Sequence, residues 1–323
     1  MDPFIILVIF LIMSIIIAFA IGANDETFSV VWGSKTLNMK QALIIATIFA
    51  ILGAVILGAA VSKTVGQKML YIELSTAVVL TILISTAIWL ILASALSLPI
   101  STTHATIGAI IGIGMFIGGG TGVNWPIIAE MAVWWMLSPI IGFVATYIAY
   151  KIIHKYHISK LNGFEEYERS EKNYSYVLLI FICITAFSRA GNDCSNAVGI
   201  VAGVGDLQID LLLLITGLSL ACGVVILGRG VIKEVGSMTE LRPSTAFAAQ
   251  IPTAAILFFG TMQGIPLSGS HMLVASLIGL AVARSAPYDK KGFIKIIIIW
   301  LLTFPISAFL AIALFFPISA MFP

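Results

Sequence analysis

The tetrapeptide Gly22-Ala23-Asn24-Asp25 interrupts an apolar stretch, and the matching Ala190-Gly191-Asn192-Asp193 interrupts another one later in the chain. A second pair follows the same rule, because Pro99-Ile100-Ser101-Thr102-Thr103-His104 is echoed by Pro266-Leu267-Ser268-Gly269-Ser270-His271. Carboxylates and hydroxyl clusters are costly in hydrocarbon and usually mark the path of an ion or a substrate. Paired polar phrases at matching places in two halves are typical of transporters built from internal repeats.

The composition indicates an integral membrane protein. Of the 323 residues, 60% are hydrophobic and 10% are charged, with a mean hydropathy of +1.09. A soluble domain carries about 25% charged residues, so little soluble mass is expected here. The net charge of +2 gives no reason to expect a nucleic-acid partner. The N-terminus lacks the basic region of a signal peptide, so the apolar stretch 4–21 is predicted to be a retained membrane segment.

Ten apolar segments are long enough to cross a bilayer, which takes about 20 residues of helix. Five precede a polar linker at 151–173, which we predict to be cytoplasmic, and five follow it. In the first half, residues 1–150, they are 4–34 (interrupted at 22–25), 41–61, 73–95, 99–117 and 127–150. In the second half, residues 174–323, they are 174–204 (interrupted at 191–193), 208–228, 243–262, 266–283 and 293–316. We therefore expect an all-α membrane protein of two five-segment halves, with broken or re-entrant helices at the midplane.

The two halves align with each other over most of their length. Asn24 and Asn192 lie 168 residues apart, and Pro99 and Pro266 lie 167 apart, with further matches in the same order. An odd number of crossings in each half would invert the second half relative to the first. Cytoplasmic loops are typically rich in Lys and Arg. In this chain, basic residues collect in the central linker and in the loops that an inverted second half would place on the same side of the membrane as the linker. The pattern favours an inverted repeat with both termini outside the cell.

The Asn-Asp phrases predict a site for a monovalent cation such as Na⁺. A glycine in each phrase permits a helix break, and freed backbone groups are tolerated in a membrane only where they line a cavity or are buried in protein. Such carbonyls, together with carboxamide and carboxylate oxygens, suit a hard cation. The predicted ligands are Asn24, Asp25, Asn192, Asp193 and Asn196. The simpler alternative is that the asparagines only cap the helices that follow them.

The hydroxyl phrases predict an anion site. Proline is favoured in the first turn of a helix, where backbone N–H groups are unpaired and the helix dipole is positive. The hydroxyls add donors without adding fixed charge, and the residues concerned are Ser101, Thr102, Thr103, Ser268, Gly269 and Ser270. Small residues on the helices that follow predict close helix packing, at Gly108 and Gly112 and at Ala275 and Gly279. The alternative is that the hydroxyls bond the carbonyls of their own helices.

Three further residues are candidates for gating or hydrogen bonding. His104 and His271 are interpreted as structural hydrogen-bonding residues, with a proton carrier or ligand as the alternative. Glu26 and Arg189 flank the Asn-Asp phrases and have no counterpart in the other half. Arg189 could balance Asp193 or attract an anion, or equally it could extend to the membrane interface.

These phrases resemble those of the inorganic phosphate transporter (PiT) family of cation-coupled phosphate symporters. Its hallmark is a duplicated Gly-Ala-Asn-Asp-x-x-Asn-Ala phrase with a duplicated Pro-x-Ser-Thr-Thr-His phrase. The resemblance implies that the Asn-Asp phrases contribute to cation and substrate sites, with Asn24 and Asn192 serving both. It implies that the hydroxyl phrases bind phosphate.

Three departures from that pattern stand out. Phe28 replaces an asparagine, Gly269 replaces a threonine, and Arg189 stands where a small residue or histidine is expected. Because both aspartates of the Asn-Asp phrases are retained, phosphate is favoured over sulfate, which the family also carries.

The sequence therefore predicts a sodium-coupled phosphate symporter of the cell membrane. A proton-coupled phosphate or sulfate permease of the same family is the alternative. An intramembrane enzyme would need a nucleophile or a metal cluster, and no His-Glu-x-x-His phrase or paired cysteines occur. A passive channel would not accumulate its solute. The expected partners are inorganic phosphate, Na⁺ (or H⁺) and the lipid bilayer, with a homodimer as one option and no resident cofactor.

Overall fold

A computed structural model describes residues 2–96, 100–203 and 208–322. All the secondary-structure elements in these ranges are helices. The first half contains α1 (Pro3–Ala23), α2 (Ser29–Gly33), α3 (Met39–Gln67), α4 (Thr76–Ala95), α5 (Thr102–Gly118), η1 (Gly119–Thr121) and α6 (Trp125–Tyr156). After η2 (Ile158–Lys160), the second half contains α7 (Phe164–Ala202), α8 (Ile209–Ile226), α9 (Arg229–Gly236), α10 (Pro243–Met262), α11 (Gly269–Arg284) and α12 (Lys290–Met321). Among the described residues, nine helices are long and apolar enough to cross a membrane, and α11 is shorter.

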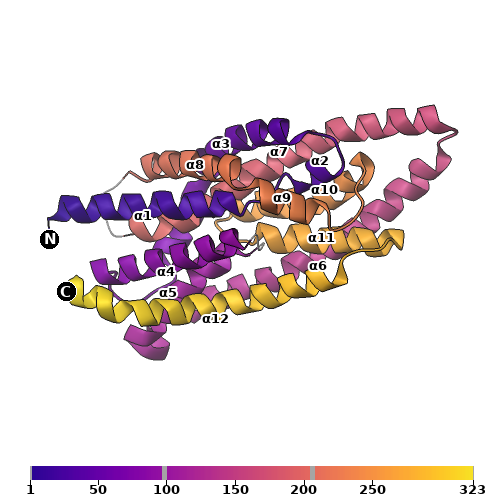
Figure 1. Ribbon diagram of the computed structural model, residues 1–323. Helices are drawn as coiled ribbons and strands as arrows, with labels where there is room; N and C mark the ends of the chain where they lie inside the picture. The colour runs from indigo at the N-terminus through magenta and orange to yellow at the C-terminus, as the bar shows by residue number, and fades with distance from the viewer. Residues whose placement is uncertain (1, 97–99, 204–207, 323) are drawn as a thin grey trace.

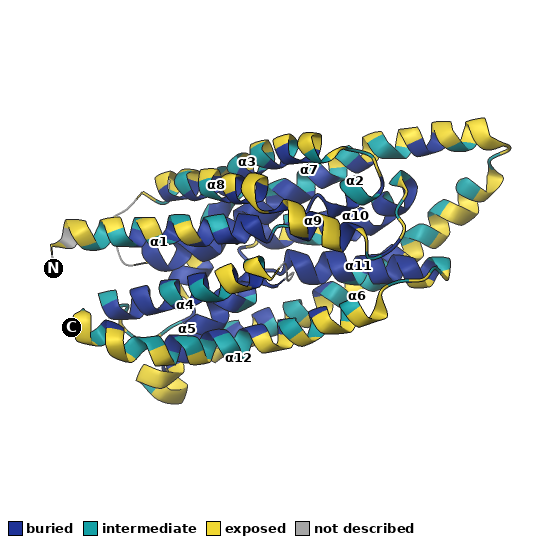
Figure 2. Ribbon diagram, viewed as in Figure 1, coloured by how far each residue is buried: buried dark blue, intermediate teal, exposed yellow. Residues whose placement is uncertain are grey.

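The helices lie in one elongated bundle, with both termini at one end and the α6–α7 connection at the other (Figure 1). The centre of the bundle is buried, whereas the far ends of α6 and α7 are exposed (Figure 2). Large apolar side chains cover the flanks, and Leu301 and Phe309 of α12 are 71% and 72% exposed. A soluble monomer rarely exposes contiguous apolar surface of this extent, so the flanks are suited to lipid.

Two helix pairs form hairpins that enter the bundle from opposite ends. The start of α4 and the end of α5 are joined where Tyr71 donates its N–H to the Gly122 carbonyl, 3.0 Å away. The base of the α10–α11 hairpin lies at the α6–α7 end, where the Ser244 N–H donates to the Glu171 carboxylate at 2.9 Å. The tips of the two hairpins, near Ile100 and Leu267, contact each other inside the bundle.

This arrangement corrects the predicted count of crossings. The segments 73–95, 99–117, 243–262 and 266–283 were expected to cross, but they are the arms of these two re-entrant hairpins. Each half keeps long helices before and after its hairpin: α1, α3 and α6 in the first, and α7, α8 and α12 in the second. Three long helices of each half therefore lie outside these hairpins.

The two predicted helix breaks have different outcomes. The break at Gly22–Asp25 is confirmed, since α1 ends at Ala23 and helix resumes only at Ser29. The break at Gly191–Asp193 is wrong, because α7 continues unbroken to Ala202. Gly191 serves packing instead: a Cβ there would lie 2.8 Å from the Gly53 carbonyl oxygen of α3.

Close helix packing is confirmed at Gly108, Gly112 and Gly279. A Cβ on Gly108 or Gly112 of α5 would come within 2.6 Å of the α12 backbone. In the same way, a Cβ on Gly279 of α11 would lie 2.3 Å from the Phe143 carbonyl oxygen of α6. The re-entrant arm of each half therefore packs along the last helix of the other half.

Replacing Gly53 by alanine should destabilise the protein. The new Cβ would lie 1.9 Å from the Phe187 carbonyl oxygen, so α3 and α7 must separate. Overpacking of this kind typically costs about 1–3 kcal/mol. The measurement is the thermal melting temperature in detergent, with Gly120→Ala as the matched control, since no atom lies within 4 Å of that Cβ. Equal melting temperatures for the two variants would contradict the packing argument.

Candidate functional site

The two hairpin tips are tied together by a reciprocal pair of hydrogen bonds. The Thr103 hydroxyl donates to the Leu267 carbonyl at 2.9 Å, and the Ser270 hydroxyl donates to the Ile100 carbonyl at 3.2 Å. Thr103 and Ser270 are 167 residues apart, as are Ile100 and Leu267, so each bond is the counterpart of the other. The predicted hydroxyl phrases are therefore brought together at the bundle centre, although Pro99 of the first phrase lies outside the described residues.

Asn24 and Asn192 anchor these tips through their side chains. The Asn24 Oδ1 accepts the Ile100 N–H at 3.1 Å, and the Asn192 Oδ1 accepts the Leu267 N–H at the same distance. Neither residue caps a following helix, since Asn24 is the C-cap of α1 and Asn192 lies inside α7, so that alternative is wrong. Both carboxamides are buried next to the hydroxyl phrases that they were predicted to serve.

The hydroxyl residues divide into helix caps and site donors. Ser101 and Ser268 are the N-caps of α5 and α11, and their hydroxyls accept the His104 and His271 N–H groups at 3.1 and 3.4 Å. Thr102 instead reaches across to the second half and donates to Asp193 Oδ1 at 2.9 Å. The alternative that the hydroxyls only bond their own helices is therefore wrong for Thr102. It is also wrong for Thr103 and Ser270, whose hydroxyls bond the opposite tip.

Arg189 lies at the centre of a buried charge cluster and contacts both halves. Its Nη1 and Nη2 donate to the two carboxylate oxygens of Glu26 at 2.7 and 3.1 Å, and its Nε donates to Asp193 Oδ2 at 3.1 Å. The same Nε lies 3.6 Å from Asp25 Oδ1, and Nη2 donates to the Ser270 hydroxyl at 3.1 Å. Arg189 is 4% exposed, so it does not extend to the membrane interface; of the alternatives left open for it, the structure shows the ion pair with Asp193.

The remaining predicted cation ligands differ in their surroundings. Asp25 Oδ1 accepts the Thr27 N–H and hydroxyl at 2.8 and 2.6 Å. Asn196 is fully buried, and its amide nitrogen donates toward the Thr103 hydroxyl at 3.3 Å. Its Oδ1 has no hydrogen-bond partner among the described residues. A buried acceptor without a partner is costly, so this oxygen is available to a ligand.

The rings of His104 and His271, the last residues of the two hydroxyl phrases, meet edge to face. Their ring centroids are 4.6 Å apart, and each ring packs on a tryptophan: Trp135 at 4.7 Å from His104, and Trp300 at 4.0 Å from His271. Trp135 also fixes the second tip, since its indole N–H donates to the Pro266 carbonyl at 2.9 Å. Sequence reasoning missed Trp135, because a tryptophan in an apolar segment gives no sign of what it contacts.

Sequence reasoning flagged Glu26 but gave it no role. The available signal was that Glu26 and Arg189 both lack a counterpart in the other half, as expected of two residues that pair with each other. One guanidinium and three carboxylates leave the cluster with two net negative charges if all are ionised. In the described ranges, no group of three or more His, Cys, Asp or Glu side chains is arranged to hold a metal ion. The carboxylates here surround Arg189 instead.

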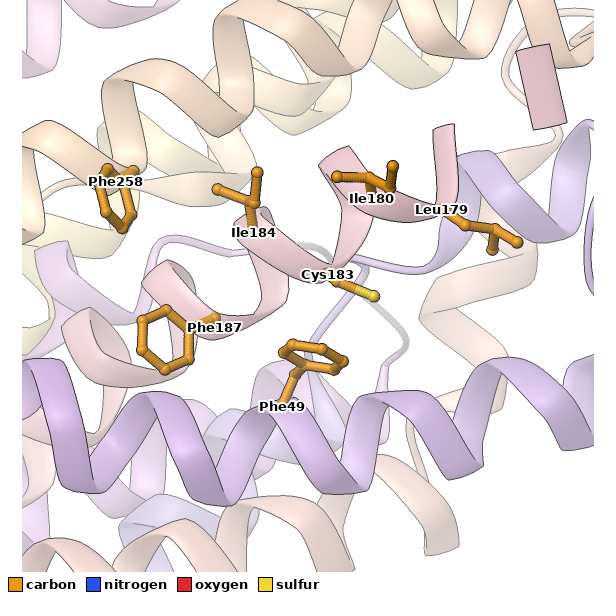
Figure 3. Close-up of a pocket in the computed structure, with 7 residues that line it drawn as sticks. All are labelled: Phe49, Leu179, Ile180, Cys183, Ile184, Phe187 and Phe258. Carbon is orange, nitrogen blue, oxygen red and sulfur yellow. The ribbon is translucent and has the colours of Figure 1, made fainter. Parts of the chain in front are cut away.

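A separate groove lies on the flank between α3, α7 and α10, and it does not suit an anion. Its volume is about 540 Å³, and its lining is apolar apart from a thiol (Figure 3). The lining residues are Phe49, Leu179, Ile180, Cys183, Ile184, Phe187 and Phe258. The hydroxyl groups of the hairpin tips and the charged groups that contact them therefore remain the candidate site.

Comparisons with known proteins agree with this site. The model of the phosphate transporter family matches residues 21–311. A protein of Thermococcus kodakarensis, provisionally named a phosphate permease, is 27% identical over 98% of both chains. The chloroplastic inorganic phosphate transporter 2-1 of Arabidopsis thaliana is 24% identical over 94% of this chain and 70% of its own. A solved structure titled the sodium-dependent phosphate transporter superposes with a TM-score of 0.90 at 25% identity, covering 98% of this chain and 99% of that one.

Proposed function

The chain belongs to the phosphate transporter family, and on that premise we propose that it is a sodium-coupled symporter of inorganic phosphate. It is a multi-pass membrane protein and not an enzyme. The observation that carries the proposal is the meeting of two hydroxyl-bearing hairpin tips with Asp193 and Asn196 at the buried centre of the bundle. The solved relative that is titled sodium-dependent supports Na⁺ as the coupled ion.

Phosphate would bind between the two tips. The residues we propose for it are Ser101, Thr102 and Thr103 on one tip and Ser268, Gly269 and Ser270 on the other, with Asn24 and Asn192 holding both in place. The N-termini of α5 and α11 point into this region and add unpaired N–H groups and a positive dipole. Opening the site to an anion requires the reciprocal bonds between the tips to break, so the tips themselves would act as the gate.

Cations are needed because the site already holds negative charge. Moving a phosphate dianion into an apolar interior without compensation would cost on the order of tens of kcal/mol. The buried carboxylates of Glu26 and Asp193, together with the partly buried carboxylate of Asp25, outnumber the one guanidinium, so a bare anion would be repelled. Na⁺ bound by the oxygens of the Asn-Asp phrases would remove that repulsion. Each net positive charge carried inward would also gain about 2.3 kcal/mol per 100 mV of membrane potential.

Alternating access would arise from two inverted repeats, residues 1–150 and 174–323. Two observations support this duplication. The tips exchange reciprocal hydrogen bonds, and α5 packs on α12 as α11 packs on α6. The termini share the end opposite the 151–173 linker, which carries several Lys and Arg residues (Figure 1). With that linker in the cytoplasm, both termini would lie outside the cell.

Radiolabelled phosphate uptake into proteoliposomes tests the proposal. An inward Na⁺ gradient should drive accumulation above the external concentration, and replacing Na⁺ by choline at fixed pH should reduce uptake to that of empty liposomes. Undiminished uptake in choline would refute sodium coupling and favour the proton-coupled alternative. Excess unlabelled sulfate should compete poorly, because strong competition would instead identify a sulfate permease.

A further inference from the structure

A cavity at the base of the α10–α11 hairpin brings two arginines together, far along the chain from the hairpin tips. Its volume is about 260 Å³, and it is lined from the end of α6, the start of α7 and both arms of the hairpin. Arg242 is the N-cap of α10 and Arg284 is the last residue of α11, and both line the cavity. Tyr150 and His154 of α6 line it as well. Two guanidinium groups and two further polar side chains therefore share one cavity.

Both arginines are held in place by groups that carry no charge. The Arg242 guanidinium donates to the Tyr167 hydroxyl and lies over the tyrosine ring, with Cζ 5.2 Å from the ring centroid. The Arg284 Nη1 donates to the backbone carbonyl of Glu240. A guanidinium presents five N–H donors in a planar fork, so each arginine keeps donors for an oxyanion.

The carboxylates nearby do not occupy these donors. Glu171 uses both of its oxygens on Ser244, accepting the N–H at 2.9 Å and the hydroxyl at 2.6 Å. The Glu240 side chain is 89% exposed and lies 4.0 Å from Arg284, and such a surface ion pair is weak. Arg242 has no ion-pair partner in the part of the chain that the structure describes. The cavity itself is lined by neither glutamate, so its walls favour an anion.

The surroundings of the cavity are those of a membrane surface. Ile148 and Ile152 of α6, which are 50% and 51% exposed, precede His154 on the same helix and are suited to contact with acyl chains. If the 151–173 linker lies in the cytoplasm, as proposed above, the cavity faces the inner leaflet. Basic pockets between membrane helices on that side bind phosphate-bearing lipid headgroups.

We propose that this cavity binds a phosphate group through Arg242 and Arg284, with Tyr150 and His154 as further hydrogen-bonding partners. The phosphate group belongs to an anionic lipid or to free inorganic phosphate. Because one arginine begins α10 and the other ends α11, the bound anion bridges the two arms of the hairpin and stabilises its base. The site is separate from the transport site and does not depend on the sodium-coupled function.

The test is the melting temperature of the purified protein in detergent, with phosphatidic acid, phosphatidylcholine or inorganic phosphate added. A ligand of the folded state raises this temperature. Phosphatidic acid should raise it in the wild type, and in Arg242→Gln with Arg284→Gln it should have no more effect than phosphatidylcholine. If the ligand is free phosphate, the shift caused by inorganic phosphate should instead be smaller in the double variant than in the wild type. The matched control, Arg229→Gln with Lys233→Gln, removes two exposed cations from α9 and should respond as the wild type does.

Two results would overturn the proposal. One is that the wild type and the double variant show equal shifts with both anions. The other is that the α9 control loses the shift as well, since the effect would then come from general surface charge. If the double variant does not fold, Arg242→Gln and Arg284→Gln taken singly give the same comparison, and each should reduce the shift. Failure of the sodium-coupled function would appear as wild-type uptake that ignores Na⁺, which leaves these melting comparisons unchanged.

Discussion

Asp193→Asn is expected to abolish Na⁺-driven phosphate uptake while leaving a folded protein. The substitution keeps the size of the side chain and removes the negative charge next to Thr102 and Asn196. Loss of outer-shell partners alone lowers metal affinity by roughly 10–100-fold, so loss of the charged ligand should lower Na⁺ affinity by more than that. The measurement is the Na⁺ concentration for half-maximal uptake in proteoliposomes, with size-exclusion chromatography to verify folding.

Thr102→Val provides the matched control for this variant. It removes the hydroxyl that donates to Asp193 but leaves the carboxylate charge and its contact with Arg189. Its Na⁺ dependence should shift far less than that of Asp193→Asn. If Asp193→Asn takes up phosphate with wild-type Na⁺ dependence, the cation is bound elsewhere and the proposed site is wrong.

The sequence predicted the polar centre well because the hydrocarbon environment leaves few explanations for polar residues there. Thr103 and Ser270 lie at the hairpin tips, and Asn24 and Asp193 bond the first of these tips from α1 and α7, so the repeated phrases meet. The helix content followed from the same constraint, since backbone groups in a membrane must be paired within the segment. These features depend on residue type and spacing, both of which are visible in one sequence.

The errors arose where one residue type serves two physical purposes. Gly22 and Gly191 both belong to Asn-Asp phrases and both allow close helix packing, on α8 and on α3, yet the helix breaks only after Gly22. Apolar length likewise does not distinguish a full crossing from an arm of a hairpin, and α4 is 20 residues long. At about 1.5 Å per residue that helix could span the hydrocarbon core, and only the contacts that Ile100 and Thr103, which follow it, make with the opposite hairpin place its end in the interior.

Arg189→Ala is expected to cause the largest loss of stability of any single substitution considered. Three carboxylates, those of Asp25, Glu26 and Asp193, would lose their shared positive partner in the buried centre. Breaking a buried ion pair by removing one partner typically costs about 3–5 kcal/mol, because the remaining charge is left uncompensated. Arg189→Lys should be intermediate, since an ammonium cannot make the bidentate contact with Glu26 while also reaching Asp193.

The source of that loss can be separated from a general effect of removing an arginine. Arg229→Ala removes an exposed arginine from α9 and should leave the melting temperature in detergent unchanged. Adding Glu26→Gln to Arg189→Ala should restore part of the lost stability, because it removes one of the uncompensated charges. The double variant would then be more stable than the sum of the single effects predicts, which is the mark of residues that interact directly. Additive effects, or an Arg189→Ala protein as stable as the wild type, would show that the buried carboxylates are neutral and that Arg189 does not balance them.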